Sequence, residues 1–315
     1  MAEQSRRLPD DANHVLIAMN PKAGAKDAKP AVRSLEKLLL ERGYDVDVIT
    51  DIDEISSRAS QYLKQGNLRT VVAAGGDGTV GLIANHTEVG TPMTVFPMGT
   101  ENLLSKYIGV RADIELVCDI IRDGAVVRLD VGRVADRLFL LMVSCGFDAD
   151  VVRRLHEARE GHIRHLSYAK PILDSIRNYQ YPELRVYCDD DEPITARWGF
   201  VFNLPCYAMG LPIAPDAVAT DGLLDVCTFK EGSLLNGLMY LGGVVFGQHH
   251  TWQDCITKKT HRIRIESDEQ VPFEIDGDPG GYLPVEIEVL PQRLTLVVPT
   301  VWAKKQASQT AEKTS

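Results

Sequence analysis

The first hundred residues repeat one pattern, in which a short apolar run is followed by a polar or glycine-rich loop and then by a helix-like stretch. The apolar runs predict buried strands at 15–19, 44–49, 70–74 and 93–96, and helical spacing follows at 30–42, 51–65, 79–85 and from about 101. This alternation predicts a parallel sheet with helices on both faces. Ligands of such sheets bind outside the carboxyl ends of the strands, so we expect the loops at 20–26, 75–79 and 97–102 to share one edge.

From about Ala125 the pattern changes to short strands, several of which alternate in polarity, with helix candidates at 148–158, 165–179 and 232–246. The strand candidates lie at 125–131, 138–144, 183–188, 194–202, 223–229, 260–266, 271–276, 284–290 and 294–298. We therefore predict an α/β fold with an N-terminal parallel-sheet domain, residues 1–124, followed by a β-sandwich-like domain, residues 125–300. The tail, residues 301–315, is predicted to fray.

Composition limits the classes of function. A formal net charge of -10 at pH 7 disfavours nucleic acid as a partner and confines any contact with an anionic membrane to a local patch. The six cysteines are far apart and form no CxxC motif, as expected of buried thiols in a reducing compartment. The first residues lack the apolar segment of a signal peptide, and the longest apolar run, 234–247, is shorter than the roughly 20 residues of a membrane-spanning helix. The sequence therefore predicts a cytoplasmic protein.

The loop Gly75-Gly76-Asp77-Gly78-Thr79 is the strongest local indication of chemistry. Its glycines allow the backbone to approach a phosphate, and the free amides of the helix that follows attract anions. Asp77 would repel a bare phosphate, so we interpret it as a residue that holds Mg²⁺ or a water on that ion, with the ion bridging the phosphates. A plain glycine-rich turn is the alternative, and the motif by itself does not separate the two.

Two further loops leave predicted strands at the same edge of the sheet. In 20–24 (NPKAG) the asparagine can fix the turn, and the lysine, with Lys26, can bring positive charge to phosphates. In 97–102 (PMGTEN), Thr100 offers a hydroxyl and a free amide at a helix start. Each loop taken alone is better explained by a simple turn or a helix cap, but three such loops at one edge favour a phosphate site.

Acidic residues cluster in another region, near the end of the second domain. Glu274, Asp276 and Asp278 stand at alternate positions of a predicted strand, so their carboxylates are expected on one side until Gly277 ends the strand. Clustered acids raise one another's pKa, which suits a general base. The alternative is a solvated strand end and turn.

Together these segments resemble the diacylglycerol kinase catalytic-domain superfamily, which includes sphingosine kinases and bacterial lipid kinases. The similarity runs from about residue 14 to 300 and takes in 20–24 (NPKAG), 75–79 (GGDGT), 97–102 (PMGTEN), 146–149 (GFDA), 211–215 (LPIAP), 221–226 (DGLLDV) and 276–278 (DGD). The resemblance implies a nucleotide-binding domain followed by a β-sandwich-like domain, with ATP in the cleft between them. It implies transfer of the γ-phosphate to a hydroxyl of a lipid such as diacylglycerol or a sphingoid base.

The resemblance also assigns roles to individual residues. Asp276 and Asp278 would supply the base that takes the proton of the lipid hydroxyl, and Asp276 is the favoured base because Asp278 is shorter than the glutamate usual at its position. Asp77 would act with Mg²⁺ on ATP. The residues expected to bind the nucleotide are Asn20, Pro21, Lys22, Gly24, Thr50, Gly75, Gly76, Asp77, Gly78, Thr79, Val80, Gly81, Gly99, Thr100 and Asn102.

A structural Mg²⁺ in the second domain is implied in the same way. It maps to the Asp221 carboxylate, with backbone carbonyls near Val218 and Leu223. Three segments depart from the family pattern. Asp278 stands where a glutamate is usual, and Gly81-Leu82 replaces the Asn-Glu pair that is common in bacterial relatives. Ala208-Met209-Gly210 stands where a double glycine usually precedes the 211–215 motif.

A lipid kinase must meet its acceptor at a membrane surface. The segment 151–165 carries Arg153, Arg154, Arg159 and Arg164 with three histidines and can meet lipid headgroups, but a solvated helical face explains it equally well. The helix over 234–247 can line an acyl-chain pocket, although ordinary core is the favoured interpretation. Peripheral membrane contact and a homodimer are compatible with these features, and nucleic acid is not an expected partner.

Two other classes of function stay open. An NAD kinase, which acts on a soluble acceptor, shares a GGDG-type loop, but it would carry a motif resembling NxGxLGF where this chain has 97–102 (PMGTEN). The second open class is a homologue that binds nucleotide or lipid but has no catalytic turnover. It stays open because Asp278, Gly81 and Leu82 differ from the family pattern. ATP consumption with mixed lipid extracts separates the three.

Overall fold

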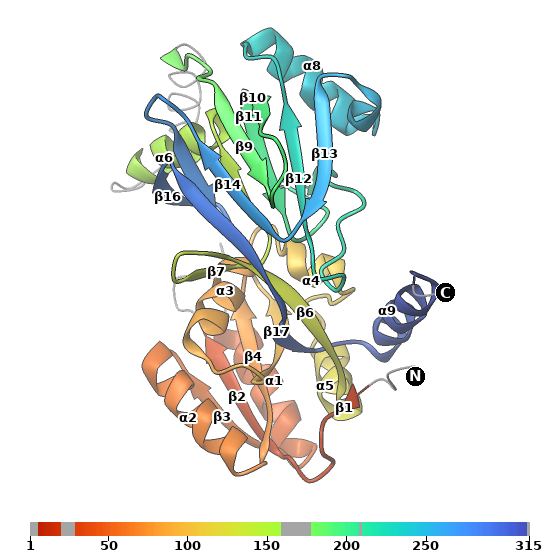
Figure 1. Cartoon of the computed structure of the whole chain (residues 1–315). Coiled ribbons are helices and arrows are strands. Elements are labelled where there is room, and N and C mark those ends of the chain that lie inside the picture. The colour runs from red at the N-terminus through yellow and green to blue at the C-terminus, as the bar shows by residue number, and fades with distance from the viewer. Residues whose placement is uncertain (1–5, 20–28, 159–177, 208–209, 314–315) are drawn as a thin grey trace. The chain divides into compact units, whose positions relative to one another are not determined.

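The computed structural model describes residues 6–19, 29–158, 178–207 and 210–313. The chain folds into two compact units, one made of residues 1–131 and 291–315 and the other of residues 132–290 (Figure 1). The sequence placed the first boundary at 124 and the end of the second domain at 300. The two divisions differ because the strands β6 (Ala125–Val134) and β17 (Val285–Val297) each begin in one unit and end in the other.

Parallel strands form the sheet of the first unit: β2 (His14–Met19), β3 (Asp45–Ile49), β4 (Leu68–Gly75) and β5 (Pro92–Pro97). Their order is β5-β4-β2-β3, and the end of β17 pairs in parallel with β5. All eight residues of β4 are buried, as expected of a central strand covered on both faces. The predicted parallel sheet is confirmed. A two-residue strand, β1 (Arg6–Arg7), pairs with the start of β6.

The sheet is accompanied by the helices α1 (Lys29–Glu41), α2 (Ile52–Lys64), α3 (Asp77–His86), α4 (Leu103–Tyr107) and α5 (Ile114–Asp123). Helix α1 packs against α5, and α2 packs against α3. Amphipathic spacing explains this packing, because α1 buries Val32, Leu35 and Leu39 along one face. Helix α2 begins after Asp51, whose side chain accepts the amide of Glu54 at 2.9 Å.

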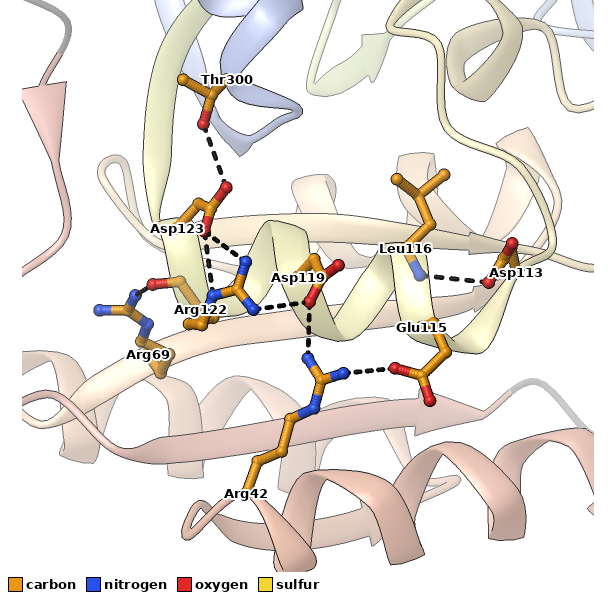
Figure 2. Close-up of polar contacts among 9 residues, drawn as sticks. All are labelled: Arg42, Arg69, Asp113, Glu115, Leu116, Asp119, Arg122, Asp123 and Thr300. Atoms are coloured by element: carbon orange, nitrogen blue, oxygen red, sulfur yellow. Dashed lines mark hydrogen bonds and ion pairs between the residues drawn. The ribbon is translucent and has the colours of Figure 1, made fainter.

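A buried arginine of β4 holds the end of α5 (Figure 2). The guanidinium of Arg69 donates to three carbonyls, those of Pro9 (2.9 Å), Ile121 (2.8 Å) and Arg122 (2.6 Å). The last carbonyls of a helix lack intrahelical partners, and a cation beside them also complements the helix dipole. Arg69 therefore fixes where α5 stops against the sheet.

The other side of α5 is joined to α1 by charge pairs (Figure 2). Arg42, just after α1, donates to the carboxylates of Glu115 and, at 2.9 Å, of Asp119. Arg122 shares the Asp119 oxygen at 2.8 Å. These side chains are partly exposed, so the network positions the helices more than it stabilises them.

The C-terminal segment is helical over α9 (Thr300–Lys313), so the predicted frayed tail is wrong. The ring of Trp302 meets that of Tyr107 edge to face, with centroids 5.6 Å apart, and Ala303 and Gln306 are buried. These positions share one helical face, and that short stripe binds an otherwise polar segment to the first unit.

The second unit is built of antiparallel strands. One sheet has the order β13-β12-β11-β8-β15-β16, and the other joins β10, β9, β14 and the first part of β17. The bounds are β7 (Arg137–Phe139), β8 (Met142–Cys145), β9 (Leu184–Cys188), β10 (Ile194–Ala196), β11 (Trp198–Phe202), β12 (Leu224–Phe229), β13 (Cys255–Thr260), β14 (Arg262–Glu266), β15 (Pro272–Ile275) and β16 (Asp278–Tyr282). Side chains of both sheets share one core, so the predicted β-sandwich-like domain is confirmed.

Helices α6 (Phe147–Ala158) and α8 (Leu234–Val245) match predicted helices, and a 3₁₀ turn covers His249–Thr251. The helix predicted over 165–179 falls almost entirely outside the described residues. The strands predicted at 284–290 and 294–298 are one strand, β17, and β13 was not predicted. Across the described ranges, no helix has both the length and the apolar character needed to cross a bilayer.

Candidate functional site

Two loops of the first unit meet where the adjacent strands β4 and β5 end. The amide of Met98 donates to the carbonyl of Gly75 at 3.0 Å. The backbones approach so closely that a Cβ on Gly99 would lie 2.5 Å from the Cα of Gly76. Only residues without a side chain allow this approach. The predicted loops 75–79 and 97–102 are therefore together, while the third predicted loop, with Asn20, Pro21, Lys22 and Gly24, lies outside the described residues.

Asp77 joins the two loops through main-chain contacts. Its Oδ2 accepts the amide of Leu103 at 2.7 Å, and its Oδ1 accepts the amide of Leu104 at 3.0 Å. These amides open α4, whose own N-cap residue, Asn102, gives no side-chain cap, so Asp77 caps that helix from a distant loop. Burial raises the pKa of the Asp77 carboxyl, and the two amide hydrogen bonds offset part of the rise.

The N-terminus of α3 has the features of an anion site. Its N-cap residue, Gly76, supplies no side-chain cap, and the first amides of a helix lack intrahelical acceptors. Gly78 is exposed there, and the hydroxyl of buried Thr79 has no hydrogen-bond partner within the described part of the chain. Val80 and Gly81 follow in the same helix, but the Val80 side chain is buried in the core. The residues present fit a nucleotide phosphate, because an uncapped helix start among small residues attracts anions.

The other residues predicted to bind the nucleotide, Thr50, Thr100 and Asn102, differ in exposure and in hydrogen-bond partners. Thr50 is exposed between β3 and α2, and Thr100 is exposed in the loop after β5. Asn102 is engaged with the protein itself: its Oδ1 accepts the amide of Gly99 at 2.9 Å, and its Nδ2 donates to the Gly99 carbonyl at 2.7 Å. Asn102 therefore shapes this loop.

In the second unit, Asp276 and Gly277 form the two-residue turn of the β15–β16 hairpin. Ile275 pairs with Asp278 across the turn, and the turn residues have φ values of 51° and 86°, as a type I′ turn requires. The prediction that Glu274, Asp276 and Asp278 share one side of a single strand is wrong, because the Asp-Gly turn reverses the chain between them.

The Asp276 carboxylate is an acceptor for the main chain. Its Oδ2 accepts the amide of Leu140 at 2.7 Å, and its Oδ1 accepts the amides of Leu141 at 2.9 Å and Met142 at 3.0 Å. Three amide donors favour the charged form of a carboxyl group. By contrast, Asp278 is exposed and pairs with Arg137 at 3.0 Å.

A second group of buried and half-buried polar side chains lies in the same unit. Ser144 donates to Oδ2 of Asp148 at 2.6 Å, and the hydroxyl of Tyr207 donates to Oδ1. Glu274 is buried, and its Oε2 accepts the amide of Gly277 at 2.6 Å. Burial raises the pKa of Asp148, and burial together with the nearby Asp148 raises the pKa of Glu274 well above its ordinary value.

Asp148 also lines an apolar cavity of about 280 Å³ in the second unit. Aromatic rings, among them Phe147, Trp198 and Phe200, form much of the wall, and α8 contributes one side. The sequence contained an indication of this site, because Asp148 belongs to the 146–149 (GFDA) motif. Its partners could not be found, since they come from other strands and loops.

Helix α8 is not ordinary core, contrary to the favoured sequence interpretation of this segment. Leu238 and Leu241 line the cavity and yet are partly exposed. Leu235 and Phe246 are 77% and 78% exposed. The helix therefore presents apolar side chains to the cavity and to solvent.

The basic segment 151–165 is only partly described. Arg153 donates to Asp150 and to Glu157, each at 2.6 Å, and Arg154 donates to Asp150 at 2.7 Å. These arginines are paired within α6 and offer less free positive charge than the sequence indicated. Arg159, Arg164 and the histidines after residue 158 lie outside the described residues.

The residues predicted to hold a structural Mg²⁺ have protein partners. Oδ1 of Asp221 accepts the amide of Leu223 at 3.2 Å, and Oδ2 accepts Nζ of Lys259 at 3.1 Å. The Val218 carbonyl accepts the amides of Thr220 and Asp221. Within the described residues, no group of three or more His, Cys, Asp or Glu side chains is arranged to hold a metal ion. This donor set does not fit a divalent ion as it stands.

Residues 14–134 match the model of the diacylglycerol kinase catalytic domain, and residues 141–298 match the YegS C-terminal NAD kinase beta sandwich-like domain. A diacylglycerol kinase of Bacillus subtilis (strain 168) is 24% identical over 93% of this chain and 97% of its own length. A diacylglycerol kinase of Mycobacterium tuberculosis (strain CDC 1551 / Oshkosh) is 28% identical over 95% of this chain and 98% of its own length.

A solved structure of a diacylglycerol kinase from Bacillus anthracis str. Sterne has the same fold, with a TM-score of 0.70 and 23% identity over 92% of this chain and 98% of that one. The two family models follow one another along the chain in the order of the two predicted domains, and the second model alone covers half of the sequence. The chain therefore belongs to the diacylglycerol kinase catalytic-domain superfamily.

Proposed function

We propose that this protein is an ATP-dependent kinase that phosphorylates a hydroxyl group of a lipid. Family membership supports kinase chemistry, and the relatives' names point to diacylglycerol as one acceptor. The observation that carries the choice of a lipid over a soluble acceptor is the aromatic cavity with a polar end at Asp148, flanked by the exposed apolar helix α8.

The first unit would bind the nucleotide. The amides at the start of α3 bind phosphate oxygens, and the close contact of Gly76 with Gly99 leaves backbone rather than side chains beside the phosphates. Asp77 holds α4 and the 97–102 loop in place for this contact. Mg²⁺ that accompanies ATP would neutralise phosphate charge.

The cavity of the second unit would take the apolar part of the acceptor. An acyl chain is flexible and apolar, and the cavity wall is mainly aromatic and aliphatic, so burial there releases water from both surfaces. The exposed side chains of α8, Leu235 and Phe246 among them, would enter the lipid surface from which the acceptor comes.

The base that takes the acceptor proton would be Asp278. Asp276 already accepts three main-chain amides, which stabilise its anion and make it a weaker base. Asp278 is exposed, and Arg137, with which it pairs, is itself partly exposed. We assign Asp276 to the positioning of the hairpin and of residues 140–142.

The proposal is tested with the full chain, labelled ATP and vesicles that contain diacylglycerol. We expect labelled phosphorylated lipid, and replacing the partly exposed cavity residue Leu241 by Trp should reduce that product while nucleotide binding is kept. NADP formed from NAD would instead support the soluble-acceptor alternative. Nucleotide binding without any lipid product, across mixed lipid extracts, would support the inactive homologue.

Membrane contact is tested separately by vesicle sedimentation. Leu235→Glu should weaken binding to vesicles, because it places a charge in the apolar surface of α8. Val301→Glu in α9 is the matched control, since Val301 is an 81% exposed apolar residue of the first unit. Equal binding by both variants would remove α8 from this role.

A further inference from the structure

The side chain of Lys259, on β13, is surrounded by oxygens of one loop and one strand. Its Nζ lies 2.8 Å from Oδ2 of Asp225, 3.1 Å from Oδ2 of Asp221 and 3.2 Å from the carbonyl oxygen of Asp216. An ammonium group has three N–H donors, so these three acceptors match its capacity. Both carboxylates are mostly buried, with side chains 16% and 14% exposed.

The position of this ammonium is set by the sheet. Asp225 of β12 and Lys259 of β13 are directly paired residues of adjacent strands, so their side chains lie on the same face. Asp221 is held by its own loop, because its Oδ1 accepts the amide of Leu223. The lysine therefore ties the 216–223 loop to the two strands.

We propose that Lys259 is a built-in cation at the place where the family resemblance predicts a structural Mg²⁺, so that the second unit folds and holds this loop without a divalent ion. The distances are those of charge-assisted hydrogen bonds, whereas Mg²⁺ requires oxygens at about 2.0–2.1 Å in octahedral order. A divalent ion among these three oxygens would have to displace the Lys259 ammonium, because two cations in one site repel each other. The inference does not depend on the proposed kinase activity, because it concerns only the cation that this loop binds.

The experiment measures thermal unfolding of the full chain without nucleotide, in EDTA and in millimolar Mg²⁺ or Ca²⁺. We expect Lys259→Ala to unfold at a lower temperature in EDTA, because Asp221 and Asp225 then repel each other. Divalent ions should raise its Tm saturably by occupying the freed oxygens. Lys258→Ala is the matched control: Lys258 is the neighbouring residue, pairs with Asp191 outside this cluster, and should give no such response. A folded Lys259→Ala protein whose Tm is indifferent to divalent ions would overturn the proposal.

A second measurement needs no lysine variant. Mn²⁺ binding to the wild-type chain is followed by electron paramagnetic resonance and compared with that of Asp221→Asn. The expected result is identical Mn²⁺ binding by the two proteins, since Lys259 already satisfies Asp221. Loss of a Mn²⁺ site in Asp221→Asn would show that the wild type binds a metal there and would overturn the inference, whatever the outcome of the activity assay.

Discussion

The contact between the two nucleotide loops gives a sharp stability prediction, which compares Gly99→Ala with Gly78→Ala. A Cβ on Gly99 would lie 2.5 Å from the Cα of Gly76, 2.9 Å from Oδ1 of Asn102 and 3.1 Å from the nitrogen of Gly76. Carbon atoms in contact sit about 3.5–4.0 Å apart, so the two backbones would have to separate by about 1 Å. At Gly78 a Cβ meets nothing within 4 Å.

The cost for Gly99→Ala follows from these contacts. Overpacking of this kind costs about 1–3 kcal/mol. Separation of the loops would also strain the two hydrogen bonds between Gly99 and Asn102, each contributing about 1 kcal/mol. The sum, about 3–5 kcal/mol if both hydrogen bonds are lost, corresponds to a fall in Tm of about 6–20 °C for a unit of this size. Gly78→Ala lies in the first turn of α3, where alanine is the better helix former by up to about 1 kcal/mol, so its Tm should stay the same or rise slightly.

The assay is thermal unfolding of the full chain by calorimetry, without nucleotide, so that loss of ligand binding does not enter the comparison. The unfolding transition whose Tm falls in Gly99→Ala should be that of the first unit. Hydrogen exchange should locate the loss of protection in Gly99→Ala to the 75–79 and 97–104 amides. A Gly99→Ala protein with the wild-type Tm, or a Gly78→Ala protein that falls as far, would show that the close approach of the two loops is not what constrains this site.

Three further predictions concern single contacts. Arg69→Met should lower the free energy of unfolding by about 3 kcal/mol, because one buried and two partly buried carbonyls lose their donor. Urea unfolding measures this loss, and Arg69→Lys should restore part of it. Asp276→Asn should lower the free energy of unfolding by about 1–2 kcal/mol, because asparagine tolerates the type I′ turn but lacks the charge that binds the three amides. Asp278→Asn should leave Tm unchanged and remove turnover. The pKa of Asp268 lies below its ordinary value because Arg185 donates hydrogen bonds to it and attracts its charge. The contribution of Asp268 to the stability of the folded state should be complete above its pKa in the unfolded state, and it should disappear as the pH falls through its lowered pKa in the folded state. An NMR titration of the Asp268 carboxyl group measures this, and a pKa that stays low in Arg185→Gln would contradict the prediction.

The first unit was largely predictable because its strands β2, β4 and β5 are continuous apolar runs, the pattern expected of strands covered on both faces of a parallel sheet. The β4 run, for instance, is buried along its whole length. Positions that depend on partners were not predictable. Helix α9 forms because Trp302 finds Tyr107, a residue almost two hundred positions earlier, and nothing in the polar tail itself indicates that contact.

Helix α8 shows a different limit of sequence patterns. An apolar run of this length indicates a helix, but it does not say whether other elements cover it. The structure leaves Leu235 and Phe246 exposed and uses other residues of the same helix to line a cavity. Burial is a property of the tertiary arrangement, whereas hydrophobicity is a property of the residue, so an exposed apolar helix and a core helix have the same sequence pattern.

The two aspartates that most strongly suggested chemistry share one structural behaviour. Asp77 accepts the amides of Leu103 and Leu104, and Asp276 accepts those of residues 140–142, so each carboxylate binds main-chain N–H groups of a segment distant in sequence. A carboxylate in that position fixes the geometry of a loop within its own unit, so we expect its replacement to change both stability and activity. Loss of activity alone therefore cannot identify a catalytic acid in this family member. For Asp77 and Asp276, a role in the reaction requires that activity fall further than the measured loss of folded protein explains. We propose that Asp278 is the acid whose replacement removes activity without a loss of folded protein.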